Sequence, residues 1–229
     1  MLPLALAACL AGMAMSDGSR NPTDDTLSGA RVTLSDVAKN AVDYLGSELR
    51  FTIQIESQPP EWNPYVTRFG TDDYRAVIAW GDEQDLWQRE AYENPAAMLF
   101  ARHGSPLEPV LDAAQRYARF DATGIVRQVL LGKPWIELTA LSPLSQQFTT
   151  GSMIHAARGM ELAASEHFDL AAQSFERALA SNLPDRARIE IERLRRESLE
   201  RVPPPIELPT KKKRGSSAPK TGSDGHQGE

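Results

Sequence analysis

Apolar and polar residues alternate with a period of two through the central part of the chain, which predicts β-strands. Between residues 49 and 56 the alternation is strict, so this segment predicts a strand with one buried face and one face in water. Four more strands are expected at residues 74–80, 97–102, 120–131 and 135–141. The pattern therefore gives five strands, all before residue 150.

Helices and a tight turn connect these strands. A leading helix is expected from Ser35, its N-cap, to Leu45, with Gly46 ending it. A second amphipathic helix is expected over 106–118, between the third and fourth strands, because apolar residues recur there at helical spacing. The segment Gly132-Lys133-Pro134 predicts a hairpin turn, since glycine accepts a positive φ and proline has no N–H for a strand ladder.

Five strands with a helix between the third and fourth is the element order of an OB-fold barrel. Three segments resemble tRNA-anticodon-binding-like OB domains: Tyr44-Leu45-Gly46, Phe120-x3-Gly124-x-Val126 and Gly132-Lys133-Pro134-Trp135-Ile136-x-Leu138. The resemblance covers about half of the chain and implies an OB-like barrel over residues 31–148. The chain departs from the family in its first strand, where Ile53-Gln54-Ile55 stands in place of the usual glycine.

The apolar period changes to 3.6 residues between 151 and 201, which predicts three helices. The first two, within residues 149–201, resemble a single tetratricopeptide repeat, a helical hairpin of about 34 residues. Residues at the small and large packing positions of that repeat are Gly159, Phe168, Ala171, Phe175 and Ala178. Stable arrays need three or more repeats, so this unit is expected to pack on the third helix, on the barrel or on another chain.

Residues 1–15 are apolar and uncharged, as in an export signal. Within them, Leu6-Ala7-Ala8-Cys9 resembles the lipobox of bacterial lipoproteins, which implies that Cys9 is the lipidation site. Two alternatives stay open: cleavage at Ala14-Met15-Ser16, or a cytosolic protein whose start lies elsewhere. Residues 16–30 are polar and predict a linker.

The last segment, residues 202–229, is expected to be a disordered tail. It contains a proline run at 203–205 and the basic run Lys211 to Arg214, and it is too poor in apolar residues to offset the entropy of ordering. The basic run is interpreted as solvated, with a nucleic-acid contact as the alternative.

Composition narrows the function classes. The 229 residues carry 25 Lys+Arg and 31 Asp+Glu, for a net charge of −6. A single cysteine rules out an intramolecular disulfide and a cysteine-built metal site. Residues 31–148 hold 11 Lys+Arg against 16 Asp+Glu, and this acidic balance disfavours nucleic acid, whose phosphates need a local basic excess.

No catalytic motif stands out in the sequence. Nucleophile elbows, phosphate loops and dinucleotide fingerprints are all missing, so no catalytic residue and no cofactor is expected. The acidic residues Asp82, Glu83 and Asp85 follow the second strand, and we interpret them as an acidic loop rather than a metal site.

These observations predict an α+β protein with an OB-like barrel, a helical hairpin and a tail. The expected function is non-enzymatic binding in the cell envelope, with a protein or cell-wall glycan as partner and membrane contact through the lipid anchor only. The candidate ligand face comprises Trp62, Tyr65, Arg68, Arg75 and Trp80. Two rival functions are a cytosolic single-stranded nucleic-acid-binding protein and an enzyme with its site in the connection 57–73.

Overall fold

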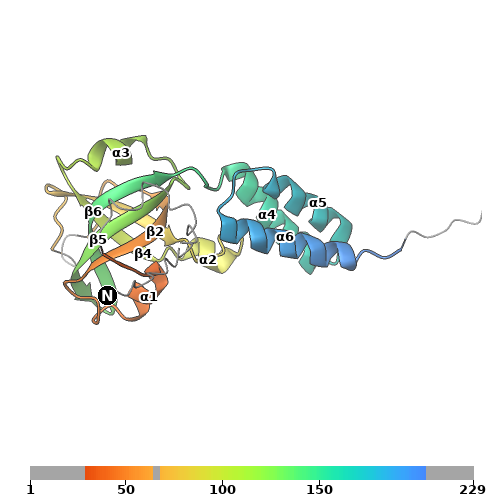
Figure 1. The fold of residues 1–229 in the computed structure, drawn as a ribbon, viewed down its shortest axis with the longest axis horizontal. Helices are drawn as coiled ribbons and strands as arrows, with labels where there is room; N and C mark the ends of the chain where they lie inside the picture. Colours follow the sequence, from red (N-terminus) through yellow and green to blue (C-terminus); the bar gives the residue numbers. More distant parts are fainter. Residues whose placement is uncertain (1–28, 64–67, 205–229) are drawn as a thin grey trace, which may run out of the picture.

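The computed structural model describes residues 29–63 and 68–204. The expected signal segment with Cys9, most of the linker 16–30, Tyr65 and most of the tail 202–229 lie outside the described residues. The described chain is a mixed α+β structure, in which a β-barrel is followed by a unit of three helices (Figure 1).

The barrel has five strands: β2 (Glu48–Ser57), β3 (Tyr74–Gly81), β4 (Ala97–Arg102), β5 (Arg119–Leu130) and β6 (Lys133–Leu144). Their order is β2-β3-β4-β6-β5, and a β2–β5 pairing closes the barrel. The pairing of β4 with β6 is parallel, and the other four barrel pairings are antiparallel. A two-residue strand, β1 (Ala30–Arg31), runs parallel to β2. This arrangement confirms the predicted OB-like barrel.

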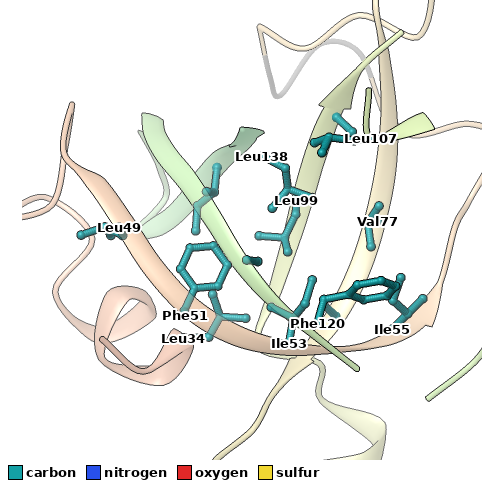
Figure 2. Close-up of a cluster of buried hydrophobic side chains, with 14 of the residues drawn as sticks. Leu34, Leu49, Phe51, Ile53, Ile55, Val77, Leu99, Leu107, Phe120 and Leu138 are labelled. Atoms are coloured by element: carbon teal, nitrogen blue, oxygen red, sulfur yellow. The ribbon is translucent and has the colours of Figure 1, made fainter. Parts of the chain in front are cut away.

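The barrel interior is built from the alternating positions that the sequence pattern indicates. Leu49, Phe51, Ile53 and Ile55 of β2 all point inward and are buried (Figure 2). Helix α1 (Leu34–Lys39) closes one end of the barrel with Leu34 and Val37, which join the same core. Helix α3 (Glu108–Ala113), between β4 and β5, lies at the opposite end and adds Leu111 (Figure 1).

Gly124 allows β5 to bend around the barrel, as its place in the predicted strand suggests. A Cβ at this position would lie 2.7 Å from Ile136 Cγ2 and 3.0 Å from the Glu137 carbonyl oxygen. The pairing of β5 with β6 also shifts register between Thr123 and Gly124. Any larger residue would therefore collide with the neighbouring strand.

Both connecting helices are shorter than predicted. Helix α1 begins after Thr33, whose hydroxyl accepts a hydrogen bond from the Asp36 N–H, and it ends before Asn40. Turns carry the chain from there to Gly46, where φ is +79°. Helix α3 ends at Ala113, because the chain becomes extended at Ala114 before it enters β5. The apolar residues that continue the helical spacing, Ala114, Tyr117 and Ala118, pack against the two cores from a non-helical segment.

The hairpin between β5 and β6 lies one residue earlier than predicted. Leu131 and Gly132 form the two-residue turn, with φ of +53° and +74°. Lys133 and Pro134 already belong to β6, where they pair with Leu130 and Val129.

Three helices follow the barrel: α4 (Thr150–Ala164), α5 (Phe168–Leu179) and α6 (Asp185–Glu200). Thr149 caps α4, since its hydroxyl accepts from the Ser152 N–H and the Ser152 hydroxyl group bonds the Thr149 N–H in return. Of the five predicted packing residues, Gly159, Ala171, Phe175 and Ala178 are buried, whereas Phe168 is half-buried.

The barrel and the helical unit share a second apolar core. Trp80 and Tyr117 come from the barrel side, and Phe148, Met153 and Phe175 come from the helical side. The ion pair between Arg186 and Asp85, 3.1 Å long, crosses the same junction. Helix α2 (Arg89–Glu93) lies between the two units (Figure 1).

Candidate functional site

The structure brings two of the five predicted ligand-face residues together. Trp62 and Arg75 line one small pocket at the start of β3. Arg68 is exposed beside β5, where its backbone N–H donates to Gln128 Oε1 at 3.1 Å. Trp80 is fully buried in the core shared with the helices, so it does not belong to an open face. Tyr65 lies outside the described residues.

A second apolar layer covers the outer face of β3, β4 and β6. The outward side chains on these strands include Ala76, Phe100 and Trp135, on the side opposite the barrel core. The β2–β3 connection folds onto them: Phe69 stacks on Phe100 with ring centroids 4.3 Å apart, and Trp62 meets Phe100 edge-on at 5.5 Å. Residues of this cluster line two hollows: Met98 and Trp135 line one, and Trp62 and Tyr74 line the other.

The larger hollow, which we call the barrel groove, has a volume of about 820 Å³. Its apolar and aromatic residues come from α1, β3, α2, the segment between α2 and β4, β4 and β6: Ala38, Ile78, Tyr92, Pro95, Ala96, Ala97, Met98, Pro134 and Trp135. Its charged residues are Glu56, Glu93, Arg116 and Lys133. The groove lies on the second and third barrel strands and beside the β5–β6 hairpin, which is where OB folds bind oligonucleotides and oligosaccharides.

One end of the barrel groove is held rigid by Arg116. Its guanidinium pairs with Glu56 at 2.9 Å and lies 5.3–5.6 Å from the ring centroids of Trp80, Tyr92 and Tyr117. Burial raises the pKa of Tyr117 to about 12, and its hydroxyl contact with Tyr92 at 3.2 Å adds to that shift. At this end of the groove, Tyr92 and Arg116 are therefore held in place from behind by the buried rings of Trp80 and Tyr117, and the charge of Arg116 is balanced by Glu56.

The smaller hollow, which we call the Trp62 pocket, has a volume of about 270 Å³. It is lined by Gln58, Pro59, Pro60, Trp62, Thr71, Tyr74, Arg75 and His103. Arg75 pairs with Asp112, and His103 Nδ1 lies 3.1 Å from Glu108. The hydrogen bond with His103, followed by the one from the Gly104 N–H, lowers the pKa of the Glu108 carboxyl.

Four arginines that line or flank the two hollows, Arg75, Arg102, Arg116 and Arg127, are paired with carboxylates. Arg102 and Arg127 both pair with Glu137, at 3.7 and 2.7 Å. On the neighbouring outer surface, Arg50 pairs with Asp121 at 2.6 Å. On the lining of the barrel groove itself, Glu56 and Glu93 balance Arg116 and Lys133, so the lining offers no basic excess for phosphate groups.

The acidic loop after β3 is occupied with structural contacts. Asp82 binds Arg119 at 2.7 Å, and Glu83 accepts the Ser35 N–H at 2.7 Å. Asp85 binds Arg186, although burial, the strongest influence on this carboxyl, raises its pKa. Across residues 29–63 and 68–204, no group of three metal-ligating side chains is found.

The sequence analysis did not identify Met98, Tyr92 and Trp135 as groove residues, although the sequence held a signal for Met98 and for Trp135. Met98 lies in the segment 97–102, which, like 74–80 and unlike 49–56, is apolar at both odd and even positions. A strand that is apolar on both faces is covered on both faces. Trp135 stands one residue before the inward Ile136, which places it on the outer face.

Comparisons with models of known protein families, with curated proteins and with solved structures gave no match to this chain.

Proposed function

We propose that this chain is a non-enzymatic binding protein of the cell envelope, and that its barrel groove takes an apolar segment of a partner protein. The observation that carries the proposal is the groove of about 820 Å³ on the outer face of β3, β4 and β6. Open grooves of this size on a rigid barrel are typical binding sites.

The composition of the groove favours a protein segment as its occupant. The floor residues Ile78, Met98 and Trp135 are half-buried and apolar, so a ligand gains most by burying apolar side chains there. Charged residues of both signs, Glu93 and Lys133, lie on the lining and can fix the direction of an extended peptide. A cell-wall glycan remains the alternative partner for this groove.

The rival function, binding of single-stranded nucleic acid, is less well supported. Such proteins track the phosphate backbone with a basic groove. Here the acidic residues Glu56 and Glu93 balance Arg116 and Lys133 on the groove lining, which has no net charge. Affinity from counterion release would therefore be small.

The helical unit supports a role in binding. Gly159 of α4 faces Phe175 of α5, which is the small-against-large packing expected of a tetratricopeptide-like hairpin. We propose that α6 acts as the first helix of a further repeat, since Ala187 and Ile191 complete the core. Units of this kind bind proteins more often than they catalyse reactions.

The proposed localisation in the cell envelope is based on the lipobox-like segment that ends at Cys9. None of the described helices is long and apolar enough to cross a bilayer. Mass spectrometry of the mature N-terminus from the membrane fraction of the native host tests the address. A diacylglyceryl-modified Cys9 is expected, and an unmodified N-terminus in the cytosol would contradict it.

The groove is tested with two variants of the full chain, one that reverses a charge on its lining and one that introduces a charge on its floor. Lys133→Glu changes an exposed lining residue, and Met98→Glu places a charge on the floor. Ile189→Glu is the matched control, because Ile189 is an exposed apolar residue of α6 outside the groove. Affinity purification from the membrane fraction should recover a partner with wild type and Ile189→Glu.

The two groove variants should lose that partner, and isothermal titration with the purified partner should show at least tenfold weaker binding. Equal recovery by all four proteins would contradict the proposal. Thermal unfolding of each variant shows whether a loss arises from misfolding.

A further inference from the structure

We propose that the Trp62 pocket is a second binding site, separate from the barrel groove, and that it takes one ring of a neutral saccharide. The pocket holds aromatic, amide, guanidinium and imidazole side chains within about 270 Å³. None of its eight lining residues also lines the barrel groove. The inference therefore stands independently of the partner proposed for the groove.

Two aromatic side chains give the pocket a rigid apolar wall. The Trp62 indole N–H donates to the Phe69 carbonyl oxygen at 2.9 Å, which fixes the orientation of the ring. Tyr74 is held edge-on against Phe69 at 4.8 Å, and its hydroxyl accepts from Arg102 at 2.9 Å. Flat aromatic surfaces that need no rearrangement suit the apolar C–H face of a sugar ring.

The polar side chains supply both donors and an acceptor. Gln58 Nε2 donates to the Leu111 carbonyl oxygen at 2.9 Å, and its Oε1 is buried with no partner among the described residues. A buried acceptor without a partner carries a free-energy cost that a ligand hydroxyl can remove. Arg75 and His103 add N–H groups on the same lining.

Charge decides between a neutral sugar and an anion. Arg75 is paired with Asp112, and His103 is paired with Glu108. The Arg75 guanidinium therefore already has its counter-charge, and a phosphate or carboxylate would meet the carboxylates of Asp112 and Glu108 beside the pocket. A saccharide has hydroxyls that both donate and accept, and it matches such paired side chains without adding charge.

The test is a titration of the full ¹⁵N-labelled chain with a neutral probe, the β-1,4-linked tetramer of N-acetylglucosamine. We expect saturable shifts of the Trp62 indole N–H and the Gln58 side-chain amide. Tyr74→Phe removes one hydroxyl and keeps the ring, and His103→Ala truncates an exposed side chain. Each should weaken binding about fivefold, the effect of one hydrogen bond.

Ile189→Glu is the control, because Ile189 is an exposed residue of α6 that lines neither hollow, and it should bind the tetramer as wild type does. Lys133→Glu alters the barrel groove, so loss of tetramer binding in Lys133→Glu but not in Tyr74→Phe or His103→Ala would overturn the proposal and assign the saccharide to the groove. The proposal is overturned if the tetramer gives no saturable shift at Trp62, or if Tyr74→Phe and His103→Ala both bind with unchanged affinity. Displacement of the tetramer by equimolar inorganic phosphate would also overturn it and would assign an anion site.

Discussion

Replacing Gly159 by alanine tests the packing of the helical unit at its tightest point. A Cβ at this position would lie 2.5 Å from Phe175 Cε1, 2.6 Å from Cδ1 and 2.8 Å from Cζ. Phe175 is fully buried, although it also lines a hollow of about 270 Å³ shared with Phe168 and Leu194, so a shift of its ring can relieve only part of this contact. The variant forces α4 and α5 apart or pushes the ring off its preferred rotamer.

Two opposing effects set the magnitude. Alanine is favoured over glycine inside a helix by about 1 kcal/mol. Overpacking a well-filled core costs about 1–3 kcal/mol. Contacts as short as 2.5 Å indicate the upper half of that range, so Gly159→Ala should lower the free energy of unfolding by about 1–2 kcal/mol.

Gly151→Ala is the matched control, since it makes the same change in the first turn of α4. A Cβ there meets only Thr149 Oγ1, at 3.8 Å, so the helix preference acts alone and stability should rise by up to about 1 kcal/mol. Urea unfolding followed by far-ultraviolet circular dichroism measures both. Adding Phe175→Leu to Gly159→Ala should relieve part of the strain. A Gly159→Ala protein as stable as the Gly151→Ala protein would refute the packing argument.

Three further predictions concern the barrel. Asp121→Asn should lower the free energy of unfolding by about 1–3 kcal/mol in urea, because it removes the charge of the carboxylate that accepts two hydrogen bonds from the largely buried Arg50 guanidinium; a change below about 0.5 kcal/mol, as for an exposed ion pair, would contradict this. Leu131→Asn should raise the thermal midpoint, with a gain of about 0.5–1 kcal/mol, because Leu131 is exposed and has a φ of +53° that asparagine tolerates better; an unchanged or lower midpoint would count against the turn. The raised pKa of Tyr117, about 12, means that the unfolded chain loses this proton first, so its contribution to stability is complete below pH 10 and is lost as the pH rises through 12. Tyr117→Phe should reduce the loss of stability between these pH values by about 1–2 kcal/mol, and identical pH profiles of the two proteins would argue against it.

The strands were predictable because one side of each faces a single closed core. Burial of alternate residues leaves a period of two in the sequence, as in residues 49–56. The element order then sufficed for the OB-like barrel, which the strand pairings confirm. Gly124, within the long fourth strand, was also recognisable from the sequence, because a strand that bends around a barrel needs a residue without a side chain where a neighbouring strand comes close.

Helix ends were less predictable, because local hydrogen bonds set them. The Thr33 hydroxyl, rather than Ser35, caps α1, and both residue types are good caps. The apolar spacing of residues 106–118 continues past α3 because Tyr117 also packs, although in a left-handed conformation with φ of +71° rather than in a helix.

The candidate face was the least predictable feature. Trp80 shares the outer side of β3 with the groove residue Ile78, but α2 and the helical unit cover it. Contacts between elements so distant in sequence leave no local pattern. Trp62 and Arg75 do line one hollow, since the first lies in the long β2–β3 connection and the second at the start of β3, and their role in binding stays a prediction.

The claim that the barrel groove binds a partner protein is tested most directly by site-specific photo-crosslinking in the native host. A photoreactive benzoylphenylalanine at Met98 lies on the groove floor, and the same residue at Ile189 is the exposed control on α6. The account predicts a discrete protein adduct from position 98 in the membrane fraction, which excess wild-type protein suppresses, and none from position 189. The same adducts from both positions, or no protein adduct from position 98, would contradict it.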